Sequence, residues 1–183
     1  MPKLIIANWK LNPTTEQEAK ALAQSISRKS AHTVVLCPPP FFLTSVKYTN
    51  LGSQDCFWQT KGPYTGQISP LQLKAAGVSY CIVGHSEKRL EGESDGQINK
   101  KILSLLEHKI TPVFCIGYGT TIKQDELEVV DILKQQLKTG LGKANSKKVI
   151  VAYEPVWAIG SGKSSKPEHA EQIAMFIKNK FDV

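Results

Sequence analysis

Short apolar segments alternate with helical segments along the chain, and this alternation limits the possible folds more than any other feature. The apolar segments are rich in β-branched and aromatic residues, which is typical of buried strands. Six of them are predicted as strands: Leu4–Ala7, Thr33–Cys37, Gln54–Trp58, Tyr80–Val83, Thr111–Ile116 and Val149–Tyr153. Strands that alternate with helices form βαβ units, so the sequence predicts an α/β fold with a parallel sheet.

Helices are predicted between these strands and after the last one. The first opens at Pro13-Thr15, because Thr15 and Glu18 have capping-box spacing, and Ala19, Leu22, Ala23 and Ile26 give it an apolar face. A short helix is expected near Ser86, directly after the fourth strand. The other predicted helices are Phe41–Leu51, Ser69–Ala76, Ser94–His108, Asp125–Lys138 and Pro167–Phe181.

Length and composition predict one globular domain over residues 1–183, with a hydrophobic content of 41%. No run of 18 apolar residues occurs, and the first ten residues become polar too early for a signal peptide. Four cysteines lie far apart and form no metal-binding spacing with histidine: Cys37, Cys56, Cys81 and Cys115. We expect them to be reduced, mostly buried thiols of a cytoplasmic protein, and we expect no membrane partner.

The net charge of +7 favours anionic partners. Lys and Arg are scattered, with no basic stripe interleaved with aromatic residues, so a nucleic-acid partner is not expected. A small anionic substrate fits the same charge, as does a plain solvated basic surface.

Polar clusters follow three of the predicted strands, at Asn8/Lys10, His85/Glu87 and Glu154. In parallel α/β folds, ligands bind at the carboxyl ends of the strands. Three such clusters on one face favour a functional site over an accidental arrangement.

Glu154 stands at the tip of the last predicted strand, and Pro155 stops that strand because proline has no N–H for pairing. The apolar residues Val156 and Trp157 come next, and the glycine-hinged segment 158–162 leads to Lys163. The pattern predicts a catalytic base followed by a hinged lid. The alternative is a strand-capping glutamate followed by an ordinary loop.

The residue types in the three clusters predict a chemistry. Lys10 is a fixed cation that could hold a phosphate or stabilise an oxyanion, although a solvated lysine is the alternative. Backbone N–H groups beside His85 favour a neutral imidazole that polarises a carbonyl, although a lone histidine is often structural. Glu87 could pair with Lys10 or Arg89, and Glu154 could take a proton beside a carbonyl group.

Together these groups imply enolisation of a small anionic carbonyl compound, with no cofactor and no metal. The glycines around Tyr118 do not form a G-x-G-x-x-G pattern, so a dinucleotide site is not expected.

Several blocks of the chain resemble the triosephosphate isomerase family, in the order that the family has them. They are residues 7–12 (ANWKLN), 61–69 (KGPYTGQIS), 82–89 (IVGHSEKR), 115–117 (CIG) and 152–160 (AYEPVWAIG). The resemblance implies a TIM barrel that interconverts dihydroxyacetone phosphate and glyceraldehyde 3-phosphate in glycolysis and gluconeogenesis. It also implies that no cofactor is needed and that the protein is a homo-oligomer, usually a dimer.

The resemblance also assigns roles to residues of this sequence. Glu154 would be the base, His85 the neutral electrophile, and Glu87 the support of Lys10. The substrate would be held by Asn8, Lys10, Ser86 and the backbone N–H of Gly160. The lid would comprise Pro155, Val156, Trp157, Ala158, Ile159, Gly160, Ser161, Gly162 and Lys163, and the dimer loop Tyr64, Thr65 and Gly66. This dimer loop would place Thr65 near Asn8 and Lys10 of the partner subunit.

The chain departs from the family pattern at several points. Leu11 stands where methionine is common, Lys88 where arginine is common, and Tyr118 where a glutamate usually helps to hold the lid. A TIM barrel has eight strands and about 250 residues, whereas six βα units are predicted here. We therefore expect an incomplete barrel with unpaired strand edges, an apolar interior open to water and without most of the family's phosphate loops.

Three explanations of this length stay open: a longer protein cut short, a natural short form whose subunits complete one another, or a homologue without activity. The expectation adopted is an isomerase whose short form oligomerises. One alternative is a catalytically impaired homologue that acts only in binding or assembly. Another is a different phosphosugar enzyme on the same kind of barrel, against which the Glu154 and His85 blocks count.

Overall fold

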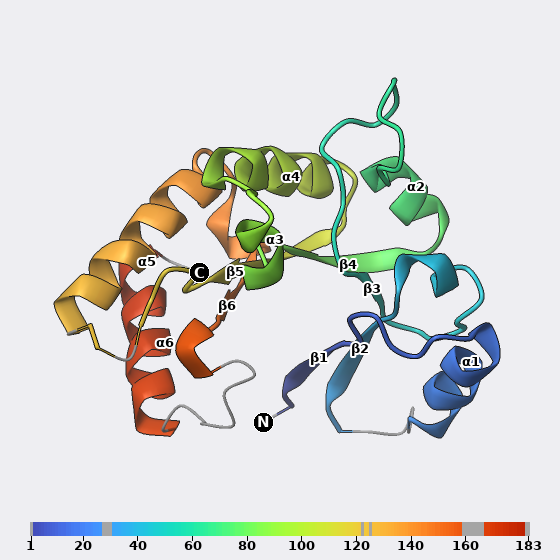
Figure 1. Ribbon diagram of the computed structural model, residues 1–183, viewed down its shortest axis with the longest axis horizontal. Coiled ribbons are helices and arrows are strands. Elements are labelled where there is room, and N and C mark those ends of the chain that lie inside the picture. The colour runs from blue at the N-terminus through green and yellow to red at the C-terminus, as the bar shows by residue number, and fades with distance from the viewer. Residues whose placement is uncertain (1, 27–30, 122, 125, 159–166, 182–183) are drawn as a thin grey trace.

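Six parallel strands form one sheet in a computed structural model of the chain, which describes residues 2–26, 31–121, 123–124, 126–158 and 167–181. The strands pair in sequence order, each with its neighbour along the chain. They are β1 (Leu4–Asn8), β2 (Thr33–Cys37), β3 (Leu51–Ser53), β4 (Val78–Val83), β5 (Thr111–Ile116) and β6 (Ile150–Tyr153). The sheet curls into a half-barrel, which confirms the predicted α/β fold of incomplete barrel type (Figure 1).

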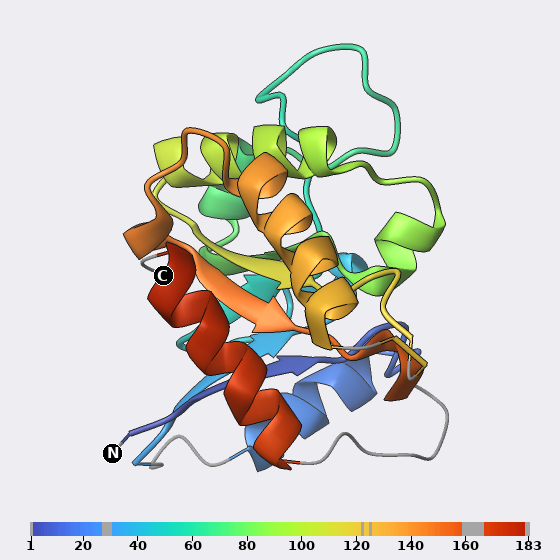
Figure 2. The same cartoon turned by 90° about the vertical axis from the view of Figure 1, so that its left-hand side faces the viewer.

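The helices lie along the convex side of the curled sheet, except for the short helix directly after β4, which lies at the carboxyl ends of the strands (Figures 1 and 2). They are α1 (Glu16–Ser25), α2 (Pro70–Ala75), α3 (Ser86–Leu90), α4 (Asp95–Glu107), α5 (Glu126–Leu141) and α6 (Pro167–Phe181). Single 3-10 turns occur at Pro40–Phe42, Ser146–Lys148 and Val156–Ala158. Figure 2 shows α6 lying over β6, the strand that precedes it. Among the described residues, no helix is long and apolar enough to cross a bilayer.

Local capping interactions set where three helices begin. Thr15 accepts a hydrogen bond from the backbone N–H of Glu18, whose side chain accepts one from the backbone N–H of Thr15, as the sequence predicts. Ser69 and Ser94 form the same reciprocal pair with the glutamine three residues later. Each box satisfies N–H groups that the first turn of a helix leaves without an intrahelical acceptor.

The two faces of the sheet build separate cores. The outer face packs Leu36, Val83, Phe114 and Ile116 against the helices, which contribute residues such as Ile98 and Leu133. On the inner face the central strands are closely packed, with Val35 and Cys37 fully buried. Inward side chains of the edge strands are only half-buried: Ile6, Ile150 and Ala152. Among the described residues, the interior is therefore partly open to water at the edge strands β1 and β6, and also at Tyr80 of β4, which is only partly buried.

The third βα unit differs from the prediction. Gln54–Trp58 is not a strand, because its side chains turn to other partners: Gln54 binds backbone carbonyls and Asp55 pairs with Lys101. The strand is Leu51–Ser53 instead, where a side chain on Gly52 would meet the Cys37 sulfur at 2.4 Å. Gly52 thus allows β3 to lie close to β2. Because glycine has a low strand propensity, the sequence did not indicate a strand at this position.

Two helix predictions also need correction. Phe41–Leu51 forms only the 3-10 turn at Pro40–Phe42, although Phe42, Leu43 and Val46 are buried as an apolar cluster. Threonine, serine and asparagine are frequent in this stretch and compete with helix formation by bonding to the local backbone. In α1, Ala19 and Ala23 are buried as predicted, but Leu22 remains 42% exposed.

Two leucines of α5 provide a test of this packing. Leu133 is fully buried, so Leu133→Ala should lower the free energy of unfolding by about 2–5 kcal/mol. Leu127 is 75% exposed on the same helix, so Leu127→Ala should change it by no more than about 0.5 kcal/mol. Urea unfolding followed by circular dichroism measures both, and equal losses would contradict the assigned helix face.

Candidate active site

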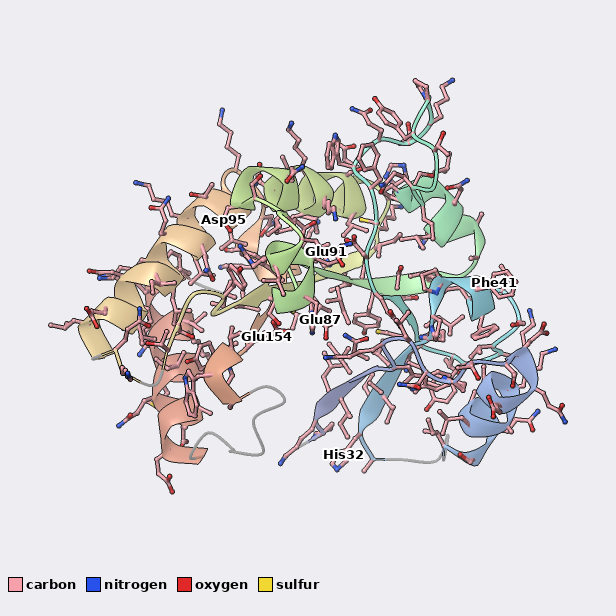
Figure 3. The ribbon with its side chains drawn as sticks, in the orientation of Figure 1. His32, Phe41, Glu87, Glu91, Asp95 and Glu154 are labelled. Carbon is pink, nitrogen blue, oxygen red and sulfur yellow. The ribbon has the colours of Figure 1, made fainter. Side chains whose placement is uncertain are left out.

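The carboxyl ends of β1, β4 and β6 bring the three predicted polar clusters together. Asn8 and Lys10 follow β1, His85 and Glu87 follow β4, and Glu154 follows β6. Figure 3 shows Glu87 and Glu154 close together at the middle of the molecule, beside α3. His85 lies between them, with Nδ1 3.6 Å from a Glu87 oxygen and Nε2 3.2 Å from a Glu154 oxygen.

Lys10 is held in an unusual backbone conformation. Its φ of +53° lies in the left-handed region, which non-glycine residues seldom adopt. Its backbone N–H donates to Asn8 Oδ1 at 3.0 Å, and its ammonium contacts Glu87 Oε1 at 2.6 Å. Of the two partners considered for Glu87, the structure pairs it with Lys10 and not with Arg89. Strain of this kind is concentrated at functional sites.

Gln54 is a member of the site that the sequence analysis missed. Its amide nitrogen donates to the carbonyl of Lys10 at 2.8 Å and to that of Cys37 at 3.0 Å. It thereby ties the strained loop to the end of β2. The only indication in the sequence is a polar side chain just beyond the end of β3, and the wrong assignment of residues 54–58 to a strand hid it.

His85 caps the N-terminus of α3, and this contact determines which ring nitrogen carries the proton. Nδ1 accepts a hydrogen bond from the backbone N–H of Glu87 at 3.2 Å, so a neutral ring carries its proton on Nε2. The Nε2–H then faces Glu154 Oε1 across 3.2 Å. The site therefore offers a neutral imidazole donor beside a carboxylate.

Glu154 is held on both oxygens and from its backbone. Oε2 accepts from the backbone N–H of Ser86 at 2.9 Å, and its own N–H donates to the carbonyl of Ile116 at 2.8 Å. Only 16% of its side chain is exposed. Burial, and then the Glu154 carboxylate, raise the pKa of the adjacent Cys115 thiol, which therefore stays protonated beside the base.

The loop after β5 supports the start of the predicted lid. Gly117 has a φ of +114°, and a side chain there would meet the Glu154 carbonyl at 2.2 Å, so only glycine fits. Gln136 of α5 accepts from the N–H of Gly117 at 2.8 Å and donates to the carbonyl of Tyr118 at 2.7 Å. Burial raises the pKa of Tyr153, which is hydrogen-bonded to Thr120 of the same loop.

Two predicted elements lie partly or wholly apart from this cluster. Pro155 to Ala158 begin the predicted lid with a 3-10 turn, whereas residues 159–163, Gly160 among them, lie outside the described residues. The predicted dimer loop Tyr64 to Gly66 belongs to the segment that projects from the body between β3 and α2 (Figures 1 and 2). There Tyr64 is 41% exposed and stacks on Phe57, with ring centres 4.6 Å apart.

The described residues hold no group of three or more His, Cys, Asp or Glu side chains arranged to bind a metal ion. What the cluster provides is a half-buried carboxylate, a neutral imidazole donor and an ammonium group. This set can remove a proton beside a carbonyl and stabilise the resulting negative charge on oxygen.

The Lys10–Glu87 pair provides a test of the site's electrostatics. The hydrogen bond from Lys10 lowers the pKa of Glu87, so Lys10→Met should raise that pKa towards the ordinary value of 4.5. Carbon-13 NMR of the carboxyl group during an acid titration measures the change. Lys20→Met is the control, because Lys20 pairs with Glu16. A Glu87 titration that Lys10→Met leaves unchanged would contradict the pairing.

The pairing of Glu87 with Lys10 makes the stability of the folded state depend on pH. A depressed pKa means that Glu87 stabilises the folded state above the unfolded value of about 4.5, and that this contribution is lost as pH falls through the folded value. Lys10→Met should therefore reduce the acid-induced loss of stability.

Comparison with known proteins agrees with this geometry. The model of the triosephosphate isomerase family matches residues 3–182. The chain is 40% identical to the triosephosphate isomerase of Caldanaerobacter subterraneus subsp. tengcongensis, over 96% of this chain and 75% of that protein. It is 38% identical to those of Clostridium novyi and Aquifex aeolicus, over 97% and 98% of this chain and 76% and 77% of those proteins. The chain therefore belongs to the triosephosphate isomerase family.

Proposed function

We propose that the chain is an isomerase that interconverts dihydroxyacetone phosphate and glyceraldehyde 3-phosphate. The observation that carries the proposal is the contact between Glu154 and His85, a carboxylate and a neutral imidazole N–H 3.2 Å apart at the carboxyl end of the sheet. Family membership and the names of the relatives support the same reaction.

The reaction moves one proton between neighbouring carbons. Glu154 takes a proton from C1 of dihydroxyacetone phosphate, while His85 Nε2–H donates a hydrogen bond to the carbonyl oxygen on C2. The enediolate that forms carries its negative charge near the ammonium of Lys10. A proton then passes from the hydroxyl oxygen on C1 to the oxygen on C2, and Glu154 returns its proton to C2. The carbonyl now stands at C1 and the hydroxyl at C2, which is glyceraldehyde 3-phosphate.

Substrate binding requires a rearrangement of the contact between base and imidazole. Glu154 Oε1 lies 3.2 Å from His85 Nε2, in the position where the substrate oxygen would accept a hydrogen bond from the Nε2–H. The carboxylate must therefore leave both His85 and the N–H of Ser86 before its oxygen reaches carbon. Glu154 directly precedes the proposed lid, residues 155–163, so closure of that segment is the motion that would carry the carboxylate inward.

The substrate and its phosphate would be held by groups after β1 and in the lid. Asn8 and Lys10 hold the substrate end near the base, and the N–H of Gly160 would contact the phosphate. The net charge of +7 favours a small anion in general.

We also propose that the chain works in the cytoplasm as a homo-oligomer, a dimer or larger. The segment from Tyr64 to Gly66 projects from the body, and Leu11 and Phe41 are 84% and 86% exposed. Contact with a second copy would bury such apolar side chains. All four cysteines are buried and free, which is typical of a reducing compartment.

The substitution Glu154→Gln tests the reaction. It keeps the side chain's shape but removes the base, so kcat should fall by about 10²-fold to 10⁴-fold while substrate affinity is retained. Steady-state turnover of glyceraldehyde 3-phosphate measures the effect, and Glu171→Gln, at an exposed position of α6, is the control. Equal turnover by Glu154→Gln and the unsubstituted protein would rule out Glu154 as the base.

A further inference from the structure

Gly84 sits at the sharp turn between β4 and His85, and the turn leaves no room for a side chain. Its φ is +71°, and an added Cβ would lie 2.9 Å from Ile98 Cδ1 and 3.1 Å from the carbonyl oxygen of Cys115. The two residues that follow supply the Nε2–H and the backbone N–H that contact Glu154. The conformation at Gly84 therefore determines where both donors point.

Two charged side chains hold the peptide groups on either side of Gly84. Glu93 Oε2 accepts from the Gly84 N–H at 3.1 Å, and Arg89 Nε donates to the Gly84 carbonyl at 2.8 Å. Both side chains are almost fully buried, with exposed fractions of 7% for Glu93 and 5% for Arg89. These two side chains therefore act on the peptide groups of Gly84.

Each of these charges is anchored on its far side. Glu93 Oε1 contacts the ammonium of Lys101, which is itself 7% exposed and also pairs with Asp55 at 2.6 Å. Arg89 donates to Asp95 at 2.6 Å and to the carbonyl of Cys115 at 3.3 Å. The guanidinium thus spans β4, β5 and α4, and the carboxylate joins β4 to α4.

Burial of the three charges on Arg89, Glu93 and Lys101 is costly, because their hydration is lost and only good geometry recovers it. A neutral side chain could satisfy either peptide group of Gly84 at lower cost. What each side chain adds is a fixed reach: it has two or more partners, so it holds the turn in one place.

We propose that Arg89 and Glu93 are positioning residues, which hold the peptide groups of Gly84 so that His85 Nε2–H and the Ser86 N–H point at the reacting groups. The proposal rests on the proposed isomerase function. It extends the site from the residues that face the substrate to a buried pair on α3 and the turn that follows it.

Two conservative substitutions of Glu93 separate positioning from charge balance. Glu93→Gln keeps the reach of the side chain, and its amide oxygen can still accept from the Gly84 N–H, but the charge beside Lys101 is lost. Glu93→Asp keeps the charge but is shorter by one methylene group, so it draws the carboxylate away from Gly84. Glu93→Gln therefore retains the reach and loses the charge, whereas Glu93→Asp retains the charge and loses the reach.

Positioning predicts that Glu93→Asp lowers kcat about tenfold or more with little change in KM, and that Glu93→Gln retains most of kcat. Nitrogen-15 NMR of the His85 ring and of the Ser86 amide should show changed signals in Glu93→Asp and near-native signals in Glu93→Gln. Thermal unfolding of both variants shows whether stability accounts for any loss of rate.

The opposite order would overturn the proposal: kcat and NMR signals preserved in Glu93→Asp but lost in Glu93→Gln would assign Glu93 to charge balance with Lys101. Unchanged His85 and Ser86 signals in both variants would also overturn it. If the unsubstituted chain shows no turnover, the isomerase function fails, but the NMR comparison still decides whether Glu93 positions the turn.

Discussion

Parallel pairing of six strands in sequence order is the constraint on which the site depends. Since every strand runs the same way, the loops after β1, β4 and β6 meet at one end of the curled sheet. Asn8 pairs in register with Cys37, Val83 with Phe114, and Ile116 with Tyr153, so these strands end at similar heights. Residues far apart in sequence thereby reach hydrogen-bonding distance without a long flexible loop.

Charged side chains at two depths surround the carboxyl end of the sheet. The outer pair, Lys10 and Glu87, is about half-exposed, whereas the side chains of Arg89, Glu93 and Lys101 are buried. A site of this kind needs both: a buried frame that aims its donors, and exposed groups that an incoming anion can reach. Buried ion pairs contribute little net stability, so their value here is geometric.

Sequence patterns predicted the features that local chemistry determines. Apolar runs located five of the six strands, the capping-box spacing of Thr15 and Glu18 located the start of α1, and strand-end positions located Asn8, His85 and Glu154. They failed at β3, where Gly52 serves a close contact that only the assembled sheet reveals. They also missed Gln54 and Gln136, whose partners are backbone carbonyls and N–H groups of distant loops. Contacts between a side chain and a distant loop leave no repeating pattern in the sequence from which they could be predicted.

The central claim is that one carboxylate of this chain moves a proton between two carbons, and isotope transfer tests it most directly. Dihydroxyacetone phosphate would be converted in D₂O, with the glyceraldehyde 3-phosphate trapped as it forms and examined by proton NMR. Deuterium is expected at C2 of part of the product, because a proton on Glu154 exchanges with solvent before delivery. The same turnover and labelling by Glu154→Gln, or no product from a folded sample, would contradict a role of Glu154 in this proton transfer.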